Sequence, residues 1–316
     1  MGLLNRRTVL LGGVALGGLV AVKGCSGAPG FDAAEAERLY PPIGKFVEVD
    51  GQRVHYWEAG HGPTLILVHG ASGNLRDWTF DVAPQLAKSY RVIAFDRPGF
   101  GHSDRGAERG WDPAVQARTL HDASRKLGVE EAIVVGHSWG GALALSWALQ
   151  YPDETIGVIP VSGVSMPYKG VAQVFGALGL DGVIVNAYGN YMKRTAAAGG
   201  IDRFIARVFR PMEPPPGYLD YVGAPLALRD QTVGWNSEDL QHVNEALLRM
   251  APDYPGLKPR VEIIHGEADF IDASHHAVPL ARRIPGAGLT LLPGVGHMAH
   301  HANIDVIDAA AQRILA

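Results

Sequence analysis

Apolar runs alternate with amphipathic stretches along most of the chain. Each run is short and almost continuously apolar, as in strands that are buried on both faces of a sheet. These predicted strands span residues 64–69, 91–96, 131–135, 155–161, 260–265 and 289–292. Stretches of helical periodicity follow them at residues 74–88, 113–127, 139–149, 273–283 and 303–315. Strands and helices in alternation predict an α/β fold with a mostly parallel, doubly wound sheet.

Two segments depart from this alternation. Residues 45–50 and 53–59 are alternating runs joined at Asp50-Gly51, which predicts a hairpin at the start of the globular part. Residues 166–257 contain helical stretches and no strong strand run. These helices are expected at residues 171–178, 184–198, 201–209, 218–228 and 237–250. We therefore predict a core that contains the sheet, built from residues 45–165 and 258–316 and interrupted by a helical cap at 166–257.

The first thirty residues have the features of an export signal. Arg6-Arg7 precedes an apolar stretch, residues 8–22, that is shorter than the ~20 residues of a comfortable membrane span. This arrangement is typical of twin-arginine leaders, so we expect residues 1–30 to direct export to the periplasmic side of a membrane. Residues 22–25 resemble a lipobox ending in Cys25, which leaves cleavage, lipidation and membrane association through residues 8–25 open. Residues 31–44 form a linker.

Composition narrows the function classes. The 316 residues are 47% hydrophobic and 19% charged, enough for one large core. A net charge of −4 without a basic stripe argues against nucleic-acid binding, so the expected partner is a small-molecule substrate. The single cysteine, Cys25, excludes an intramolecular disulfide framework and any cysteine-based metal site. No cofactor or metal is expected.

The strongest chemical signal is Gly136-His137-Ser138-Trp139-Gly140, a G-x-S-x-G between a predicted strand and a predicted helix. A strand that turns this sharply into a helix strains the backbone of its middle residue, and flanking glycines remove the Cβ atoms that would clash. Such a turn exposes the Ser138 hydroxyl at a helix N-terminus, where negative charge is favoured. The pattern predicts a nucleophile.

Two further residues follow strand ends at the same edge. Asp269 comes after the strand at 260–265, and His297 comes after the last strand. In open parallel sheets, ligands bind beyond the carboxyl ends of the strands. Serine needs an imidazole to accept its proton, and the imidazole needs a carboxylate to fix its tautomer. Ser138, Asp269 and His297 therefore form a candidate triad.

Four segments in this order resemble the capped α/β-hydrolase superfamily: His69-Gly70, residues 96–104 (DRPGFGHSD), residues 136–141 (GHSWGG) and the pair GxxD and GHM at 266–269 and 296–298. The resemblance covers residues 45–316. It implies Ser138 as nucleophile, His297 as general base and then acid, and Asp269 as the orienting acid. It also implies an oxyanion hole from the backbone N–H groups of Ala71 and Trp139.

Several neighbours compete for these roles. Glu267 and Asp272 could replace Asp269, although the GxxD spacing favours Asp269. His300 and His301 lie near His297, but neither directly follows the glycine at the strand end.

The remaining polar residues near the motifs are assigned supporting roles. His137 is interpreted as structural, and His69 is expected to brace its loop by hydrogen bonds. Residues Asp96 and Ser103 are expected to fix their loop, whereas His102 and Asp104 are expected in the loop or at the surface. His275 and His276 are adjacent on a predicted helix and cannot share a metal-ligand face.

The predicted reaction is hydrolysis of a small to medium carboxylic ester through an acyl-enzyme on Ser138. The aromatic residues of the cap suit a hydrophobic substrate, although most of them are expected to pack the cap onto the sheet. Two alternatives remain: hydrolysis of a C–C bond in a diketone, and a non-catalytic binding protein on the same fold.

Overall fold

The computed structural model describes residues 32–106, 108–168, 191, 194–195 and 200–316. The predicted leader, one predicted helix (171–178) and most of another (184–198) lie outside these residues. Among the described helices, none combines the length and hydropathy needed to cross a bilayer. Export, lipidation and the division into linker, core and cap therefore stay predictions.

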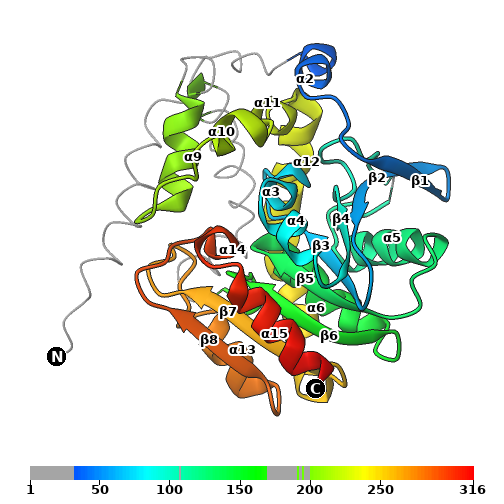
Figure 1. Ribbon diagram of the computed structural model, residues 1–316, viewed down its shortest axis with the longest axis vertical. Helices are drawn as coiled ribbons and strands as arrows, with labels where there is room; N and C mark the ends of the chain where they lie inside the picture. The colour runs from blue at the N-terminus through cyan, green and yellow to red at the C-terminus, as the bar shows by residue number, and fades with distance from the viewer. Residues whose placement is uncertain (1–31, 107, 169–190, 192–193, 196–199) are drawn as a thin grey trace.

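The centre of the molecule is a sheet of eight strands, which confirms the predicted fold class (Figure 1). In spatial order the strands are β1 (Lys45–Val49), β2 (Gln52–Ala59), β4 (Arg91–Phe95), β3 (Thr64–Val68), β5 (Ala132–His137), β6 (Thr155–Val161), β7 (Arg260–Gly266) and β8 (Gly288–Leu292). The pairs β1–β2 and β2–β4 are antiparallel, and every other pair is parallel. Asp50 and Gly51 both have positive φ, as the predicted tight hairpin requires.

The core lies in two layers, one on each face of the sheet. Alternate residues of β3 point to opposite faces, so Ile66 packs in one cluster and Leu67 in the other. One layer contains α5 (Pro113–Lys126), α6 (Trp139–Gln150) and α13 (Ala277–Arg283). The other contains α3 (Arg76–Thr79), α4 (Val82–Leu86) and α15 (Asp305–Leu315).

Between β6 and β7 the described residues form helices. These are α9 (Ile201–Phe209), α10 (Tyr218–Tyr221), α11 (Ala224–Ala227), α12 (Asp230–Met250) and the 3₁₀ helix η1 (Ala251–Gly256). Figure 1 shows α9, α10 and α11 together on one side of the sheet, away from α13 and α15. A short helix before the sheet, α2 (Ala33–Leu39), contacts α11. Near the C-terminus, α14 (Ala299–Ala302) precedes α15.

Several predicted helix boundaries are wrong. The segment expected as one helix at 218–228 is two helices, because Gly223 adopts a left-handed φ of 69° between them. The long cap helix begins at Asp230, seven residues before its predicted start, and the helix predicted from 273 begins only at Ala277. A single predicted helix after the loop at 69–73 is divided into α3 and α4 at Asp81.

Candidate active site

Ser138 lies at the turn from β5 into α6 and has φ 54° and ψ −118°. This conformation costs a non-glycine residue on the order of 1–3 kcal/mol, so the surrounding structure must enforce it. Here the enforcing contacts are tight, because a Cβ at Gly136 would collide with the carbonyl oxygen of Gly140. The Ser138 N–H donates to the Val161 carbonyl on the next strand, at 3.0 Å. The hydroxyl is thereby held at the N-terminus of α6.

His297 and Asp269 meet beyond the ends of β7 and β8. The Nδ1 atom of His297 lies 3.0 Å from each carboxylate oxygen of Asp269, and the Asp269 side chain is fully buried. Because the carboxylate can only accept, Nδ1 carries a proton, and in the neutral form of the ring Nε2 is the acceptor. The Ile271 N–H also donates to Asp269, at 2.8 Å. Of the three acids considered, Asp269 is the one that contacts this imidazole, while Asp272 accepts from the Ser274 N–H.

Ser138 and His297 line the same cavity, of about 400 Å³. Ala71 and Trp139 line it as well. The backbone N–H groups of Ala71 and Trp139 donate to no described residue, so both are free for a ligand. The structure thus brings four of the five predicted site residues to one cavity. The fifth, Asp269, is buried behind His297 and does not line it.

Hydrogen bonds of His69 fix the loop that carries Ala71, as predicted. The Arg97 N–H donates to His69 Nε2 at 3.0 Å, so the other ring nitrogen, Nδ1, carries the proton and donates to the Gly70 carbonyl at 2.8 Å. Burial lowers the pKa of His69 to about 4, which keeps the ring neutral. A Cβ at Gly70 would lie 2.8 Å from the Cβ of Ser138, so only glycine permits this approach.

The loop after β4 is fixed by the two residues predicted for that role. Asp96 accepts from the Leu75 N–H at 2.7 Å and from the His102 N–H at 2.8 Å, while its Oδ2 also meets His55 at 2.7 Å. Ser103 donates to the Asp96 carbonyl at 2.8 Å. His102 is half-buried in the loop.

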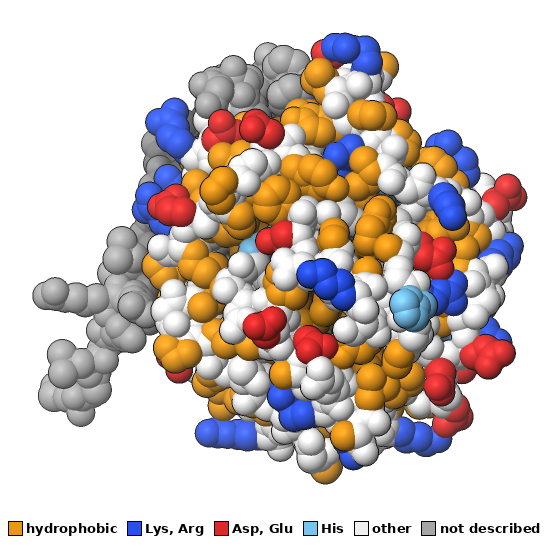
Figure 2. Space-filling model, viewed as in Figure 1, with side chains coloured by type: hydrophobic (Ala, Val, Ile, Leu, Met, Phe, Trp, Pro, Cys, Tyr) orange, Lys and Arg blue, Asp and Glu red, His pale blue; other side chains and the backbone are white. Residues whose placement is uncertain are grey.

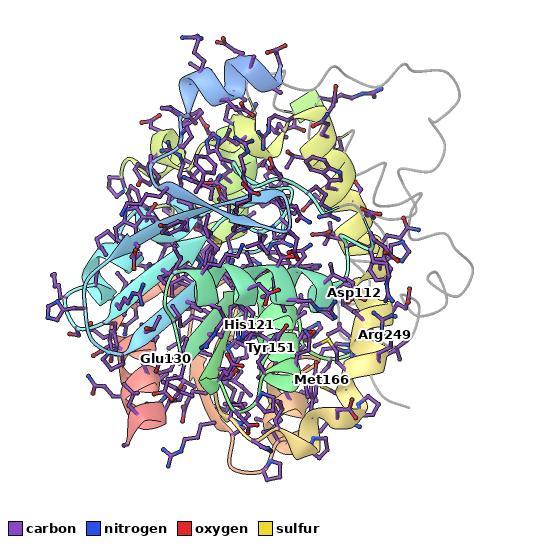
Figure 3. All side chains as sticks on the ribbon, turned by 90° about the vertical axis from the view of Figure 1, so that its right-hand side faces the viewer. Asp112, His121, Glu130, Tyr151, Met166 and Arg249 are labelled. Atoms are coloured by element: carbon purple, nitrogen blue, oxygen red, sulfur yellow. The ribbon has the colours of Figure 1, made fainter. Side chains whose placement is uncertain are left out.

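A buried ion pair joins helix α12 to the loop after β4. Arg97 donates to Asp239 of α12 at 2.8 Å and to the Gly70 carbonyl at 3.2 Å. Its guanidinium lies between the rings of Phe100 and Trp139, 4.1 Å from each centroid. A second link joins α12 to the start of α5, where Arg249 donates to Asp112 at 2.8 Å; both are labelled in Figure 3.

Sequence reasoning missed the partners of two histidines at the site. His137 Nε2 donates to the carbonyl oxygen of His297 at 3.1 Å, so this structural residue holds the segment of the candidate base. His265, the penultimate residue of β7, lies 3.3 Å from Asp269 and donates to the Ile271 carbonyl at 2.7 Å. The sequence could have indicated His265, because it lies at the end of a predicted strand, at the same edge of the sheet as Asp269.

A second polar cluster lies beside the cavity. Asp77 of α3 is within 3.1 Å of His300, 2.9 Å of His301 and 2.8 Å of the Tyr218 hydroxyl, and His301 also bonds Asp81 at 2.9 Å. Burial opposes protonation of His301, yet hydrogen bonds to these two carboxylates raise its pKa to about 9. Neither His300 nor His301 therefore competes with His297 for Asp269.

A group of possible metal ligands occurs at this cluster, which the sequence did not indicate. Ligand atoms of Asp77, His300 and His301 lie within 4.8 Å of one another, although hydrogen bonds already satisfy Asp77. The prediction that His275 and His276 lie on a helix was wrong, because α13 begins after His276. There His275 meets the Pro167 carbonyl and His276 accepts from the Ser165 N–H.

Comparison with known proteins agrees with this architecture. The family model described as alpha/beta hydrolase fold matches residues 63–303, and the chain belongs to that family. An uncharacterized protein of Mycobacterium tuberculosis is 27% identical over 285 residues, covering 85% of this chain and 81% of its own. A 2-hydroxy-6-oxo-6-phenylhexa-2,4-dienoate hydrolase of Burkholderia cepacia is 35% identical over 147 residues, 42% of this chain and 51% of its own.

The fold also matches solved structures. An esterase from Exiguobacterium antarcticum superposes with a TM-score of 0.70 at 18% identity, covering 87% of this chain and all of the esterase. At that identity the likeness concerns the fold alone. Membership of the family supports hydrolase activity for this chain.

Proposed function

We propose that this protein is a serine hydrolase that cleaves carboxylic esters, with Ser138 as nucleophile, His297 as base and Asp269 as orienting acid. One observation carries the proposal. An imidazole whose Nδ1 is bound by a buried carboxylate shares a cavity with a serine held in a strained strand-to-helix turn. Hydrolysis by a serine nucleophile requires this combination, because the imidazole must present an unprotonated Nε2 close to the serine hydroxyl.

The reaction follows from these positions. His297 Nε2 accepts the Ser138 proton as the hydroxyl oxygen attacks the ester carbonyl. The N–H groups of Ala71 and Trp139 stabilise the oxyanion, and each such donor contributes about 3 kcal/mol to catalysis in enzymes of this kind. His297 then protonates the departing alcohol. In the second half, His297 activates water, which releases the acid and restores Ser138.

The cavity lining favours an uncharged, hydrophobic substrate. Apolar side chains such as Phe204, Val208, Leu240 and Phe270 dominate it, and no lysine or arginine lines it among the described residues. On the molecular surface drawn in Figure 2, hydrophobic side chains gather in the upper half, where Figure 1 places α9 to α11.

Two alternatives fit the same cavity less well. The C–C bond hydrolases among the relatives are named for substrates that carry carboxylates, such as 2-hydroxy-6-oxo-6-phenylhexa-2,4-dienoate. A carboxylate in a largely apolar cavity needs a cationic partner, which the described lining does not supply. A non-catalytic binding protein would not need an oriented imidazole beside a strained serine.

Activity and active-site labelling test the proposal together. We expect hydrolysis of p-nitrophenyl butyrate and labelling of Ser138 by a fluorophosphonate. His297→Ala should lower kcat on the order of 10⁴-fold or more, because the serine then lacks its base. His275→Ala is the matched control, since its ring lies outside the cavity lining. Wild-type protein that is neither labelled nor active would favour the binding protein. Cleavage of a meta-cleavage diketone but of no ester would favour C–C chemistry.

A further inference from the structure

Asn236 on the cap helix α12 reaches the loop that carries Ala71. The Ser72 N–H donates to Asn236 Oδ1 at 2.8 Å, and Ser72 has a left-handed φ of 56°. Because a backbone N–H can only donate, the atom facing it must be the amide oxygen. The orientation of the Asn236 amide is therefore fixed, with its NH₂ group turned away from the loop.

The NH₂ group of Asn236 has no hydrogen-bond partner among the described residues. Nδ2 donates to no described residue, and it is not among the buried atoms that lack a hydrogen bond. The residue is 8% exposed and lines the cavity. The donor therefore faces space that a ligand can occupy. Leaving such a donor unpaired in a ligand complex costs about 1–3 kcal/mol, so a ligand that offers an acceptor is favoured.

Most other polar side chains of the cavity are already engaged. Asn74 donates to the Val222 carbonyl and accepts from the Arg76 N–H. Asp77 is bound by His300, His301 and Tyr218. His137 donates to the His297 carbonyl.

Most of the side-chain donors that remain adjoin the loop that carries Ala71. Outside the five proposed catalytic groups, they are Asn236 Nδ2 and the hydroxyls of Ser72 and Ser237, and the hydroxyl of Tyr168 is a further one. Ser72 adjoins Ala71 in sequence, and Ser237 adjoins Asn236. Apart from the Tyr168 hydroxyl, the unpaired side-chain donors of the described lining are therefore concentrated beside the loop that carries Ala71, while most of the remaining wall is apolar.

We propose that Asn236 determines specificity by donating through Nδ2 to a second oxygen of the substrate, within a few bonds of the scissile carbonyl. The preferred substrates are then esters that carry an additional uncharged acceptor, such as a keto, hydroxyl or ether oxygen, on an otherwise apolar skeleton. This inference rests on the proposed ester hydrolysis. The acceptor can belong to the acyl part or to the alcohol part, and the experiment separates these two sources.

The test compares matched ester pairs by titrating released acid. Ethyl 3-oxobutanoate is compared with ethyl butanoate for the acyl part, and 2-methoxyethyl butanoate with butyl butanoate for the alcohol part. The readout is the ratio of kcat/KM within each pair, in the wild type and in Asn236→Asp. Aspartate keeps the acceptor for the Ser72 N–H and the shape of the side chain but removes the NH₂ donor.

We expect Asn236→Asp to lower the ratio on the order of 10-fold for the pair whose extra oxygen is bound, as for one lost hydrogen bond. Taking a ratio cancels effects that the new charge has on both esters. Asn244→Asp is the matched control, because Asn244 on the same helix accepts from the Tyr168 N–H at 2.8 Å and lies outside the cavity lining. That variant should keep the wild-type ratio. Asn236→Ala supplies a second variant in case the aspartate unfolds the protein.

Unchanged ratios for both pairs in the Asn236 variants would overturn the inference. A structural role, in which Asn236 only holds the loop, would give that result, with Asn236→Ala slowing both members of each pair equally. Failure of the proposed function looks different, because the wild type would then hydrolyse none of the four esters. That outcome removes both proposals.

Discussion

Buried histidines near the cavity hold different charges because their neighbours differ. His301 has a carboxylate at each ring nitrogen, Asp77 at 2.9 Å and Asp81 at 2.9 Å, and it stays protonated at neutral pH. Burial instead lowers the pKa of His137 and of His300, so both rings are neutral. Neutral His137 can donate one proton to the His297 carbonyl without placing a positive charge beside the candidate base.

These opposite shifts predict a maximum of stability near pH 6.5. The folded pKa of His301, about 9, exceeds its ordinary value of 6.5, so its contribution is complete below 6.5 and disappears as the pH rises through 9. The free energy of unfolding should fall on the order of 3 kcal/mol across that interval. Below 6.5, the rings with lowered pKa, including His69 at about 4, make stability fall with decreasing pH.

Urea unfolding at a series of pH values measures both limbs. His301→Gln should flatten the alkaline limb, because the titrating group is gone. His275→Gln is the control, since its ring bonds the Pro167 carbonyl rather than a carboxylate. An alkaline limb that persists in His301→Gln would contradict the assignment.

At the scale of elements, α12 is linked to the loop that carries Ala71. Asp239 bonds Arg97 at 2.8 Å and Arg105 at 2.7 Å, with both Arg97 and Asp239 fully buried. Arg97 in turn donates to the Gly70 carbonyl, directly before Ala71. Asn236 on the same helix binds the residue after Ala71. Helix α12 therefore supports this loop on both sides of Ala71, the proposed oxyanion donor.

Asp239→Asn should destabilise the protein by about 3–5 kcal/mol, because it leaves the fully buried guanidinium of Arg97 without a negative partner. Glu238→Gln is a matched control on the next residue. Glu238 also pairs with Arg105, at 3.0 Å, but is 45% exposed, so its loss should change stability by about 0–1 kcal/mol. Equal effects of the two substitutions on the urea midpoint would show that the buried Arg97–Asp239 pair contributes no more to stability than the exposed Glu238 does.

For the whole molecule, we propose that the described fold is exported behind its leader. The first strand of the α/β-hydrolase sheet begins at Lys45, so an export signal at residues 1–30 would precede the sheet. Fused to a reporter, these residues should direct export in a bacterial host with a functional twin-arginine exporter. Changing Arg6 and Arg7 to Lys should reduce export severely, whereas Arg38→Lys in the full-length chain should not. Equal export by the double variant would refute the twin-arginine assignment.

The sequence by itself determined the parts of this protein that local pattern encodes. Continuous apolar runs mark strands buried on both faces, and a glycine-flanked serine marks the turn after β5. Asp269 and His297 were predictable because both follow strand ends, and parallel strands end at one edge. Helix boundaries in the cap were less predictable, since the start of α12 at Asp230 lacks a side-chain cap signal.

Only the tertiary structure decided which distant polar groups meet. Asn236 lies 164 positions from Ser72, and Asp239 lies 142 from Arg97, so no local periodicity relates them. Such pairs form because burying a polar group without a partner is costly, and packing of the cap selects which partner is available. The same reason explains His301, whose charge depends on Asp77 and Asp81, more than 200 residues earlier in the chain.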